Sequence, residues 1–290
     1  MARAPKLILE QADQSPLDFA VESRDRASIA MVEQAVRGKK FDLAFQPVVL
    51  ASDPARHLFH EGLIRLFDTT GRIIPAAQFI HSVEDLELGR QIDLAALSRA
   101  LHMLAKTDGL VLSINTSARS LVYPPWQDRL RQMLKRRPGI GPRLIVEVPE
   151  VSVLQIPELA GHAIETLRKL GVRFVLDDFG AGASSLRHLR DFQFEFLKLD
   201  GQFTKGVCSN PTNQALCEGV ISLGYHLGAR TIAARVEDEV DTLWLQKAGV
   251  DAMQGFYFAA PTLNPHWHTG ENAAAPAGAA KNLAATQKFR

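Results

Sequence analysis

The chain has little cysteine and no long apolar run. Only Cys208 and Cys217 occur in its 290 residues, which argues for a reducing compartment, and neither has neighbours arranged for a zinc site. No apolar run is long enough to span a bilayer, and the apolar stretch near the start is too short for a signal peptide. We therefore expect a cytoplasmic protein without a membrane span.

The chain also lacks an excess of charge of either sign. Its 33 Lys and Arg residues nearly balance its 32 Asp and Glu residues, which gives a formal net charge of +1. Such a chain has no long-range field that would attract a nucleic acid, so we expect no nucleic acid among its partners. Hydrophobic residues make up 46% and charged residues 22%, as is typical of a globular protein with a substantial core.

Composition divides the chain into three parts. Residues 1–26 are mixed and charged with weak periodicity, so they are predicted to form an N-terminal extension. Residues 27–262 carry the regular apolar pattern of one folded domain. Residues 263–290 are rich in Ala, Gly and Asn with few large apolar residues, which predicts a flexible C-terminal tail.

Eight short apolar runs alternate with segments of helical spacing in the central part. In ELAGHAIETLRKLG, for example, Leu159, Ile164, Leu167 and Leu170 share one helical face, and Gly171 is placed to cap the helix. Continuous apolar strands alternating with helices indicate a parallel sheet covered by helices, and eight units fit an α/β fold of the (β/α)8 type better than an open sheet. The runs are FDLAFQPVV, HLFHEGLIRL, LVLSINTS, RLIVEVPE, RFVLDDFG, FEFLKLDGQF, RTIAARVED and AMQGFYFAAP.

Polar residues stand where these strands end, which is the edge at which such a barrel builds its active site. Several carboxylates converging on one mouth repel one another unless cations compensate them. An all-oxygen ligand set suits magnesium or manganese and not zinc, and two such ions form the usual clamp for displacement at phosphorus. The strand-end residues are Glu61, Asn115, Glu147, Asp177, Asp178, Lys198 and Gln254.

Simpler readings exist for several of these residues. A lone carboxylate at a strand end is commonly a helix cap or an ion-pair partner, and Asn115 before Thr116 and Ser117 is placed to cap the next helix. The loop 180–185 has the spacing of a dinucleotide-binding turn, with Asp200 where a ribose-binding acid would lie. That loop lacks its third glycine, and two aspartates before it would repel a pyrophosphate. Five oxygen ligands at strand ends therefore favour the metal site.

These residues fall into motifs that resemble the EAL domain, the cyclic-di-GMP (c-di-GMP) phosphodiesterase family, over residues 27–262. The motifs follow in the family's order and at matching intervals, which makes the resemblance specific. They are Gln46-Pro47, Glu61-Gly62-Leu63-Ile64-Arg65, Ser113-Ile114-Asn115-Thr116-Ser117-Ala118-Arg119, Val146-Glu147-Val148-Pro149-Glu150, the Asp177–Ser185 loop, Leu197-Lys198-Leu199-Asp200 and Gln254-Gly255-Phe256.

The resemblance implies a modified TIM-type (β/α)8 barrel whose first strand is antiparallel to the rest. It implies hydrolysis of one phosphodiester bond of c-di-GMP to give the linear dinucleotide, and it leaves open a homodimer formed near the Asp177–Ser185 loop. The implied Mg²⁺ or Mn²⁺ ligands are Glu61, Asn115, Glu147, Asp177 and Asp178. The implied catalytic residues are Lys198, Asp178 and Gln254, and the implied substrate-binding residues are Gln46 and Arg65.

One motif departs from the family pattern. The seventh strand ends A-E-G-V-E in the family and Ala233-Ala234-Arg235-Val236-Glu237 here. The glutamate missing at Ala234 is the one that the resemblance associates with the second metal ion and the hydrolytic water. Loss of a metal-ligating carboxylate should cost more than the 10- to 100-fold typical of outer-sphere changes. Glu237 survives and is placed as a helix cap, while Arg235 brings a fixed positive charge.

Three functions remain open at this point. The first is a protein that binds c-di-GMP with weak or absent hydrolysis and signals to a partner protein. The second is a working phosphodiesterase in which water or Glu237 replaces the missing ligand. The third is an interaction scaffold that binds neither nucleotide nor metal. The retained motif residues argue against the scaffold, and Ala234 favours binding over turnover.

Overall fold

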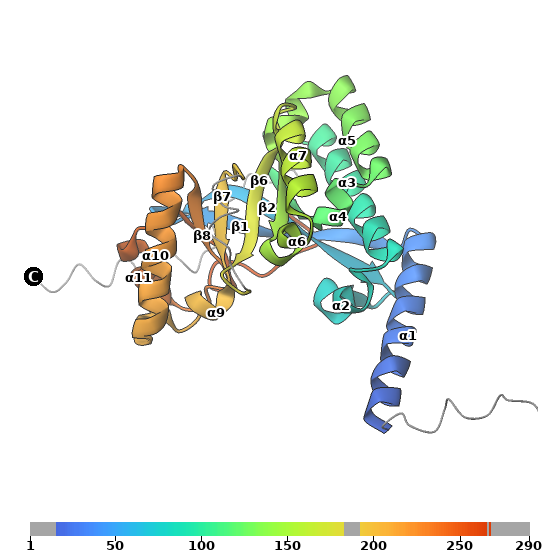
Figure 1. Cartoon of the computed structure of the whole chain (residues 1–290), viewed down its shortest axis with the longest axis horizontal. Coiled ribbons are helices and arrows are strands. Elements are labelled where there is room, and N and C mark those ends of the chain that lie inside the picture. The colour runs from blue at the N-terminus through green and yellow to red at the C-terminus, as the bar shows by residue number, and fades with distance from the viewer. Residues whose placement is uncertain (1–15, 183–191, 266, 268–290) are drawn as a thin grey trace, which may run out of the picture.

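A closed barrel of eight strands forms the centre of the protein (Figure 1). The computed structural model describes residues 16–182, 192–265 and 267, with side chains from residue 26 onward. The predictions for residues 1–15, for most of the tail and for the loop from Ala183 lie outside the described residues. The barrel strands are β1 (Phe41–Leu50), β2 (Asp53–Phe67), β4 (Leu112–Asn115), β5 (Leu144–Pro149), β6 (Arg173–Phe179), β7 (Phe196–Leu199), β8 (Arg230–Ala233) and β9 (Ala252–Met253).

The direction of β1 confirms the predicted modified barrel. β1 runs antiparallel to both of its neighbours, β2 and β9, whereas the other neighbouring barrel strands pair in parallel. The short strand β3 (Ile73–Pro75) extends the sheet beyond β2 and lies outside the ring. The carboxyl ends of β2 and β4 to β9 therefore open at one mouth.

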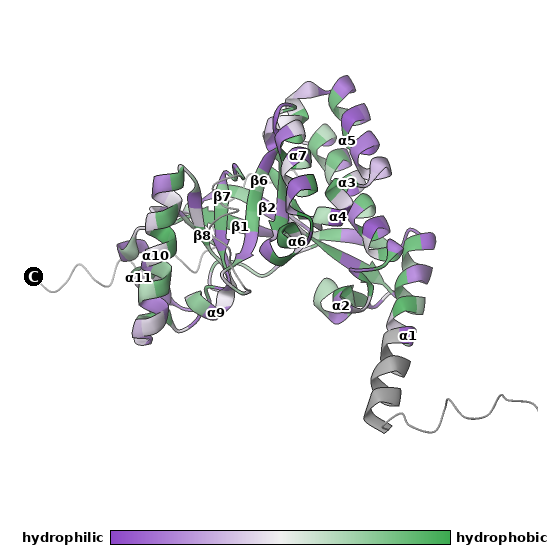
Figure 2. Ribbon diagram, viewed as in Figure 1, coloured by the Kyte–Doolittle hydropathy of each residue, from purple (hydrophilic) through white to green (hydrophobic). Residues whose placement is uncertain are grey.

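Helices cover the outside of the barrel, which explains why the strands read as continuous apolar runs. Side chains alternate between the barrel interior and the helix layer, so both sets are buried. Figure 2 shows the apolar residues on the strands and the hydrophilic ones on the outward side of helices such as α5. The interior cluster contains Val48, Phe59, Ile145, Val175, Phe196, Ile232 and Ala252.

The helices have unequal lengths. None in the described part of the chain is both long and apolar enough to cross a membrane. α1 stands out from the barrel (Figure 1) and begins at Pro16, within the segment predicted as an N-terminal extension. The helices are α1 (Pro16–Arg37), α2 (Ile80–Val83), α3 (Glu87–Lys106), α4 (Ala118–Leu121), α5 (Pro124–Arg136), α6 (Glu150–Gln155), α7 (Pro157–Arg168), α9 (Gly201–Thr204), α10 (Pro211–Leu227) and α11 (Glu239–Ala248).

The prediction that four residues of α7 and its end share a buried face is correct for two of them. Ile164 and Leu167 are buried against the barrel, but Leu159 is 60% exposed and Leu170 is 40% exposed. Periodicity identifies the inward direction of a helix, while the width of the contact depends on the neighbours it packs against. Gly171 has a φ of +87°, so its predicted capping position is confirmed as a left-handed residue after the helix.

The chain continues to pack on the barrel beyond Thr262. Phe45 of β1 exchanges backbone hydrogen bonds with Thr262, at 2.8 and 3.0 Å. Trp267 then lies edge-on to Phe45 and to His60, with ring centroids 5.3 and 4.5 Å apart. The first residues of the predicted tail therefore cover the outer face of the β1–β2 pair.

Gly255 marks a place where two backbone segments touch, and it gives a test of the fold. A Cβ atom at this position would collide with the backbone nitrogen and carbonyl oxygen of Val236, which cannot yield as a flexible side chain can. We expect Gly255→Ala to lower the free energy of unfolding by about 1–3 kcal/mol. Urea denaturation measures this change, with Gly139→Ala as a matched control because nothing lies within 4 Å of its added Cβ. Equal stability of the two variants would contradict the packing at Gly255.

Candidate functional site

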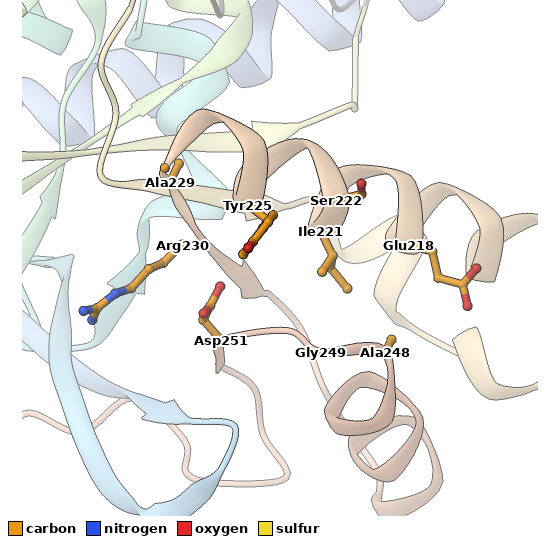
Figure 3. Close-up of a pocket in the computed structure, with 10 residues that line it drawn as sticks. Glu218, Ile221, Ser222, Tyr225, Ala229, Arg230, Ala248, Gly249 and Asp251 are labelled. Atoms are coloured by element: carbon orange, nitrogen blue, oxygen red, sulfur yellow. The ribbon is translucent and has the colours of Figure 1, made fainter.

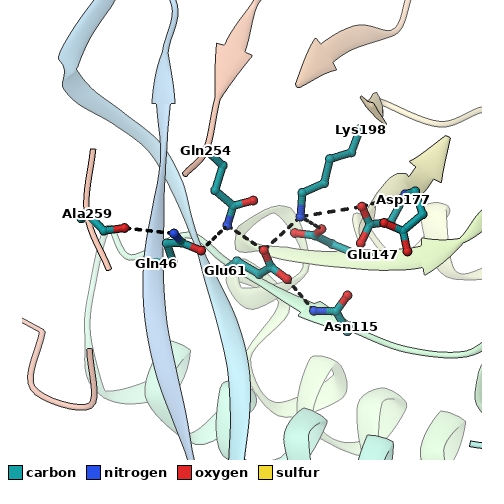
Figure 4. Close-up of polar contacts among 9 residues, drawn as sticks. Gln46, Glu61, Asn115, Glu147, Asp177, Lys198, Gln254 and Ala259 are labelled. Atoms are coloured by element: carbon teal, nitrogen blue, oxygen red, sulfur yellow. Dashed lines mark hydrogen bonds and ion pairs between the residues drawn. The ribbon is translucent and has the colours of Figure 1, made fainter. Parts of the chain in front are cut away.

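A buried lysine lies among three carboxylates at the mouth of the barrel (Figure 4). Lys198 Nζ donates hydrogen bonds to Glu61 Oε2 at 2.9 Å and to Glu147 Oε2 at 2.6 Å. Asp177 Oδ1 lies 3.8 Å from the same nitrogen. These side chains come from β7, β2, β5 and β6, and all are largely buried. The compensating positive charge that the acidic strand ends require is therefore supplied by the chain itself.

Two side-chain amides complete the group. Gln254 Nε2 donates to Glu61 Oε2 at 2.7 Å, and Asn115 Nδ2 donates to Glu61 Oε1 at 2.5 Å. Gln46 lies next to Gln254, whose Nε2 is 3.4 Å from Gln46 Oε1, and Gln46 Nε2 donates to the carbonyl of Ala259 at 2.9 Å. Both oxygens of Glu61 are thereby fixed in position by hydrogen bonds.

Strand register explains why residues far apart in sequence meet here. Asn115 pairs in register with Glu147, and Gln46 lies opposite Glu61 across the antiparallel β1–β2 pair. Alternation along β2 points Glu61 into the barrel and the preceding His60 outward onto Trp267. A shift of one residue in any of these strands would turn its polar side chain to the opposite face.

Burial and mutual charge set the ionisation of the group. Burial alone would lower the pKa of Lys198, but the three surrounding carboxylates hold this pKa well above its usual value. Burial opposes ionisation of Glu61 too, but the Lys198 charge and the two amide hydrogen bonds lower the pKa of this carboxyl. Burial, with the charge of Glu61, raises the pKa of Glu147 to about 8. Burial likewise raises the pKa of Asp177 to about 6.

Asp178 lies apart from this group. It is exposed, its backbone has a left-handed φ of 51°, and its amide donates to Asp177 Oδ1 at 2.9 Å. Although the residue is exposed, partial desolvation of its carboxyl group and the charge of Asp200 raise the pKa of Asp178, against the opposing charges of Lys198 and Arg235. The structure thus brings Glu61, Asn115, Glu147, Asp177, Lys198 and Gln254 together and leaves Asp178 on the side of Asp200.

Arg65 follows Glu61 by four residues and lies on the same strand. It is half-buried, and its guanidinium donates to the carbonyl of Ile64 at 3.0 Å. Burial lowers the pKa of Arg65 although the charge of Glu61 opposes this change. A partly desolvated guanidinium beside the mouth is suited to hold an anionic ligand group.

The donor chemistry of the buried group fits one divalent ion. Its ligands are hard oxygens, and Glu147 Oε1 is buried without a hydrogen-bond partner. In the described part of the chain no set of three His, Cys, Asp or Glu side chains is spaced to hold a metal, and Lys198 Nζ lies between the carboxylates instead. Binding of an ion by Glu61, Asn115, Glu147 and Asp177 would therefore require the ammonium group to move away from Glu61 or Glu147.

Two supporting carboxylates were missed by sequence reasoning. Glu150 is 3% exposed and accepts a hydrogen bond from the amide of Gly180 at 3.1 Å, which ties the turn after β5 to the loop after β6. Asp93 of α3 accepts from the amide of Ser117 at 3.0 Å, and burial raises its pKa to about 6. Glu150 could have been noticed because it ends the Val146–Glu150 motif, whereas Asp93 stands in an ordinary helical sequence.

The structure shows the local roles of Asn115 and Glu237, which were considered as helix caps, and of Asp200, which was considered as a ribose-binding acid. Asn115 does not cap a helix, because Ser117 caps α4 by accepting from the amide of Ser120. Asp200 caps α9 by accepting from Gln202, which gives it a local role unrelated to a ribose. Glu237 is not the cap of α11. That cap is Asp238, while Glu237 pairs with Lys205 at 2.6 Å.

A hollow lies between α10 and α11, at the end of the barrel opposite the mouth (Figure 3). It has a volume of about 590 Å³ and opens beside the first residues of β8 and β9. Ile221 and Tyr225 provide apolar surface, and Glu218, Arg230 and Asp251 provide charge. Asp251 is already engaged by the amide and hydroxyl of Thr231, at 2.7 and 3.0 Å. This hollow contains none of the motif residues.

The chain belongs to the EAL domain family, which matches residues 29–261. It is 29% identical over 236 residues to the signaling protein YkoW of Bacillus subtilis, covering 80% of this chain and 29% of that protein. It is also 29% identical over 234 residues to the cyclic di-GMP phosphodiesterase PdeR of Escherichia coli, covering 79% and 35% respectively. The chain therefore spans about a third of the length of these relatives.

A solved structure agrees with this assignment. The PaMucR phosphodiesterase, solved as a c-di-GMP complex, superimposes with a TM-score of 0.75 at 26% identity, covering 84% of this chain and 99% of that one. The two proteins therefore share the same barrel fold.

Proposed function

We propose that the protein binds c-di-GMP and hydrolyses it weakly or not at all. One observation carries this proposal. The buried polar group around Lys198 is intact, whereas the residue directly after β8 is Ala234, which cannot ionise. The proposal is supported by the names of relatives, since PdeR is a cyclic di-GMP phosphodiesterase and PaMucR is a phosphodiesterase solved with c-di-GMP.

The retained side chains are suited to binding and positioning. Arg65 and Gln46 would contact the dinucleotide, and Lys198, Asp178 and Gln254 would act near the phosphodiester and the attacking water. Glu61, Asn115, Glu147 and Asp177 would hold a Mg²⁺ or Mn²⁺ ion, with Asp178 on the side of a second one. When bound, such an ion polarises a phosphoryl oxygen and activates water.

The residues after β8 are poorly suited to a second ion. Ala234 offers no ligand oxygen from its side chain, and its backbone carbonyl accepts a hydrogen bond from the hydroxyl of Thr204. Glu237 does not replace the missing carboxylate, because it pairs with Lys205 on the surface. The protein therefore lacks a ligand for the second of the two metal ions that together stabilise the attacking and leaving oxygens.

A direct assay tests this proposal. Purified protein is incubated with c-di-GMP and Mg²⁺ or Mn²⁺, and both bound and linear nucleotide are quantified. Binding with little product supports the proposal, and rapid product formation would identify a working phosphodiesterase. Absence of binding would favour the scaffold.

We further propose a cytoplasmic location and signalling through a partner protein, with a homodimer as the assembly.

Arg65 should contribute measurably to nucleotide affinity. A charge-assisted hydrogen bond contributes about 1.5–3 kcal/mol, so we expect Arg65→Ala to weaken c-di-GMP binding by at least about tenfold. Isothermal titration calorimetry measures the change. Arg72→Ala is the matched control, because Arg72 is an exposed arginine paired with Asp68 beyond the end of β2. An unchanged dissociation constant for Arg65→Ala would mean that this pocket is not used.

Asp177 should contribute to metal affinity. A carboxamide keeps the size of the side chain but loses its charge, so we expect Asp177→Asn to weaken Mn²⁺ binding by at least about tenfold. Because the pKa of Asp177 is about 6, wild-type affinity should also rise as the pH increases through this value. Calorimetry with Mn²⁺ at pH 5.5 and 7.5 measures both effects. Equal affinity in the two proteins would remove Asp177 from the metal site.

A further inference from the structure

Arg235 is an exposed cation in an unusual backbone conformation at the mouth of the barrel. It follows β8 by two residues and has a φ of 53°, in the left-handed region. A residue with a Cβ atom enters this region at a cost of roughly 1–2 kcal/mol. Such strain concentrates at functional sites, where the surrounding structure holds the residue in place.

The neighbouring helix leaves room for the Arg235 side chain. Gly201, the buried first residue of α9, lies directly beneath it, and an added Cβ at Gly201 would collide with the Arg235 stem. From the same helix, the hydroxyl of Thr204 donates a hydrogen bond to the carbonyl of Ala234. The Arg235 stem therefore packs on α9, and α9 also holds the backbone just before it.

Arg235 lies at the mouth beside the start of α9, because its stem packs on Gly201, the residue after Asp200. Lys198 pairs with Glu61, Glu147 and Asp177, and Arg235 takes no part in this group. Glu237 is the acidic residue nearest to Arg235 in sequence, and it forms an ion pair with Lys205 at 2.6 Å. Arg235 itself has no ion pair within 4 Å in the described part of the chain, so its guanidinium is available to an anionic ligand.

We propose that Arg235 is a phosphate-binding residue, whose guanidinium takes a phosphodiester group of the ligand at the mouth, beside the start of α9. A planar guanidinium presents two parallel N–H donors to phosphate oxygens, and it carries its charge permanently. This inference rests on the proposed binding of c-di-GMP. It adds that one of the phosphates is held at this point by a side chain of the protein instead of a divalent ion.

Charge-removing and charge-keeping variants test the inference. We expect Arg235→Gln to weaken c-di-GMP binding at least tenfold by calorimetry, with EDTA as well as with Mn²⁺ present. Arg235→Lys keeps a single charge and should lose less. Arg230→Gln is the matched control, because it removes the same charge from the opposite end of β8 and should leave affinity unchanged. Thermal melting of each variant checks that the barrel is intact.

The outcomes separate this inference from the function on which it rests. If the wild type binds c-di-GMP and Arg235→Gln binds equally well, Arg235 is not a phosphate ligand, while the proposed function stands. If Arg230→Gln weakens binding as much as Arg235→Gln, the effect comes from general charge and the assignment to Arg235 is wrong. If the wild type binds no c-di-GMP, both proposals fail together.

Discussion

Replacing Lys198 with methionine is expected to lower the free energy of unfolding by about 3–5 kcal/mol at pH 8. The variant keeps the length of the side chain but leaves Glu61, Glu147 and Asp177 without their shared ammonium group. Removing one partner of a buried ionic group costs far more than removing a surface pair, because the remaining charges stay desolvated. Urea denaturation measures the difference.

The loss should depend on pH with a definite sign. Glu147 already has a pKa near 8, against a usual value of 4.5, so the folded state holds its proton more tightly than the unfolded state does. Stability linked to such a carboxyl is present below about pH 4.5 and is lost as the pH rises toward the folded pKa. Removal of the Lys198 charge should raise this pKa further. The variant should therefore lose most stability between about pH 5 and 8.

Lys169→Met is a suitable control for this experiment. Lys169 also pairs with a glutamate, Glu165, at 2.8 Å, but the two side chains are 72% and 66% exposed. A solvent-exposed pair of this kind contributes about 0–1 kcal/mol. Similar losses in Lys198→Met and Lys169→Met would show that the buried group does not depend on its ammonium centre.

Restoring a carboxylate after β8 should increase turnover. We expect Ala234→Glu to raise c-di-GMP hydrolysis at least tenfold, which corresponds to about 1.4 kcal/mol of activation free energy. The remaining oxygen ligands and Lys198 are already in place, and a glutamate at this position would add the ligand that the second ion lacks. Product formation in the presence of Mn²⁺ measures the change.

At saturating c-di-GMP, where the affinity that Arg235 is proposed to supply does not limit the rate, the double variant Ala234→Glu with Arg235→Gly should raise hydrolysis further, with a gain on the order of 100-fold. Glycine adopts the left-handed backbone at position 235 without strain, and its introduction removes a positive charge beside the restored ion. Arg235→Gly alone is the control, because it relieves the same strain without adding a ligand. If the unmodified protein already hydrolyses c-di-GMP as fast as the double variant, it is an ordinary phosphodiesterase and the proposed function is wrong.

The strands and the residues at their ends could be predicted from the sequence because both follow from short periodic patterns. The eight apolar runs correspond to the eight barrel strands, and the strand-end side chains around Lys198 meet as expected. The contacts of Lys198 could not be predicted. Its position at a strand end places it at the mouth, but only the geometry shows that its side chain reaches three carboxylates.

Features that depend on packing between distant segments could not be predicted. Asp93 supports Ser117 from a helix whose sequence gives no sign of this contact. The left-handed backbone of Arg235 depends on how α9 and the end of β8 meet, which no local pattern encodes. The exposure of Leu159 likewise depends on where the neighbours of α7 end. Local periodicity identifies elements, whereas contacts between them require the assembled fold.

The antiparallel first strand has a consequence for how the protein is made. β1 and β2 are neighbours in sequence and can pair as soon as they leave the ribosome, but β1 also closes the ring against β9. Gln46 and Gln254 face each other across this seam and are 208 positions apart in sequence. Closing so long a loop is slow, and chains are synthesised from the N-terminus onward. The hydrogen bond from Gln254 to Glu61 is therefore completed last, so a nascent chain that ends before β9 has Lys198 and its carboxylates but no finished site.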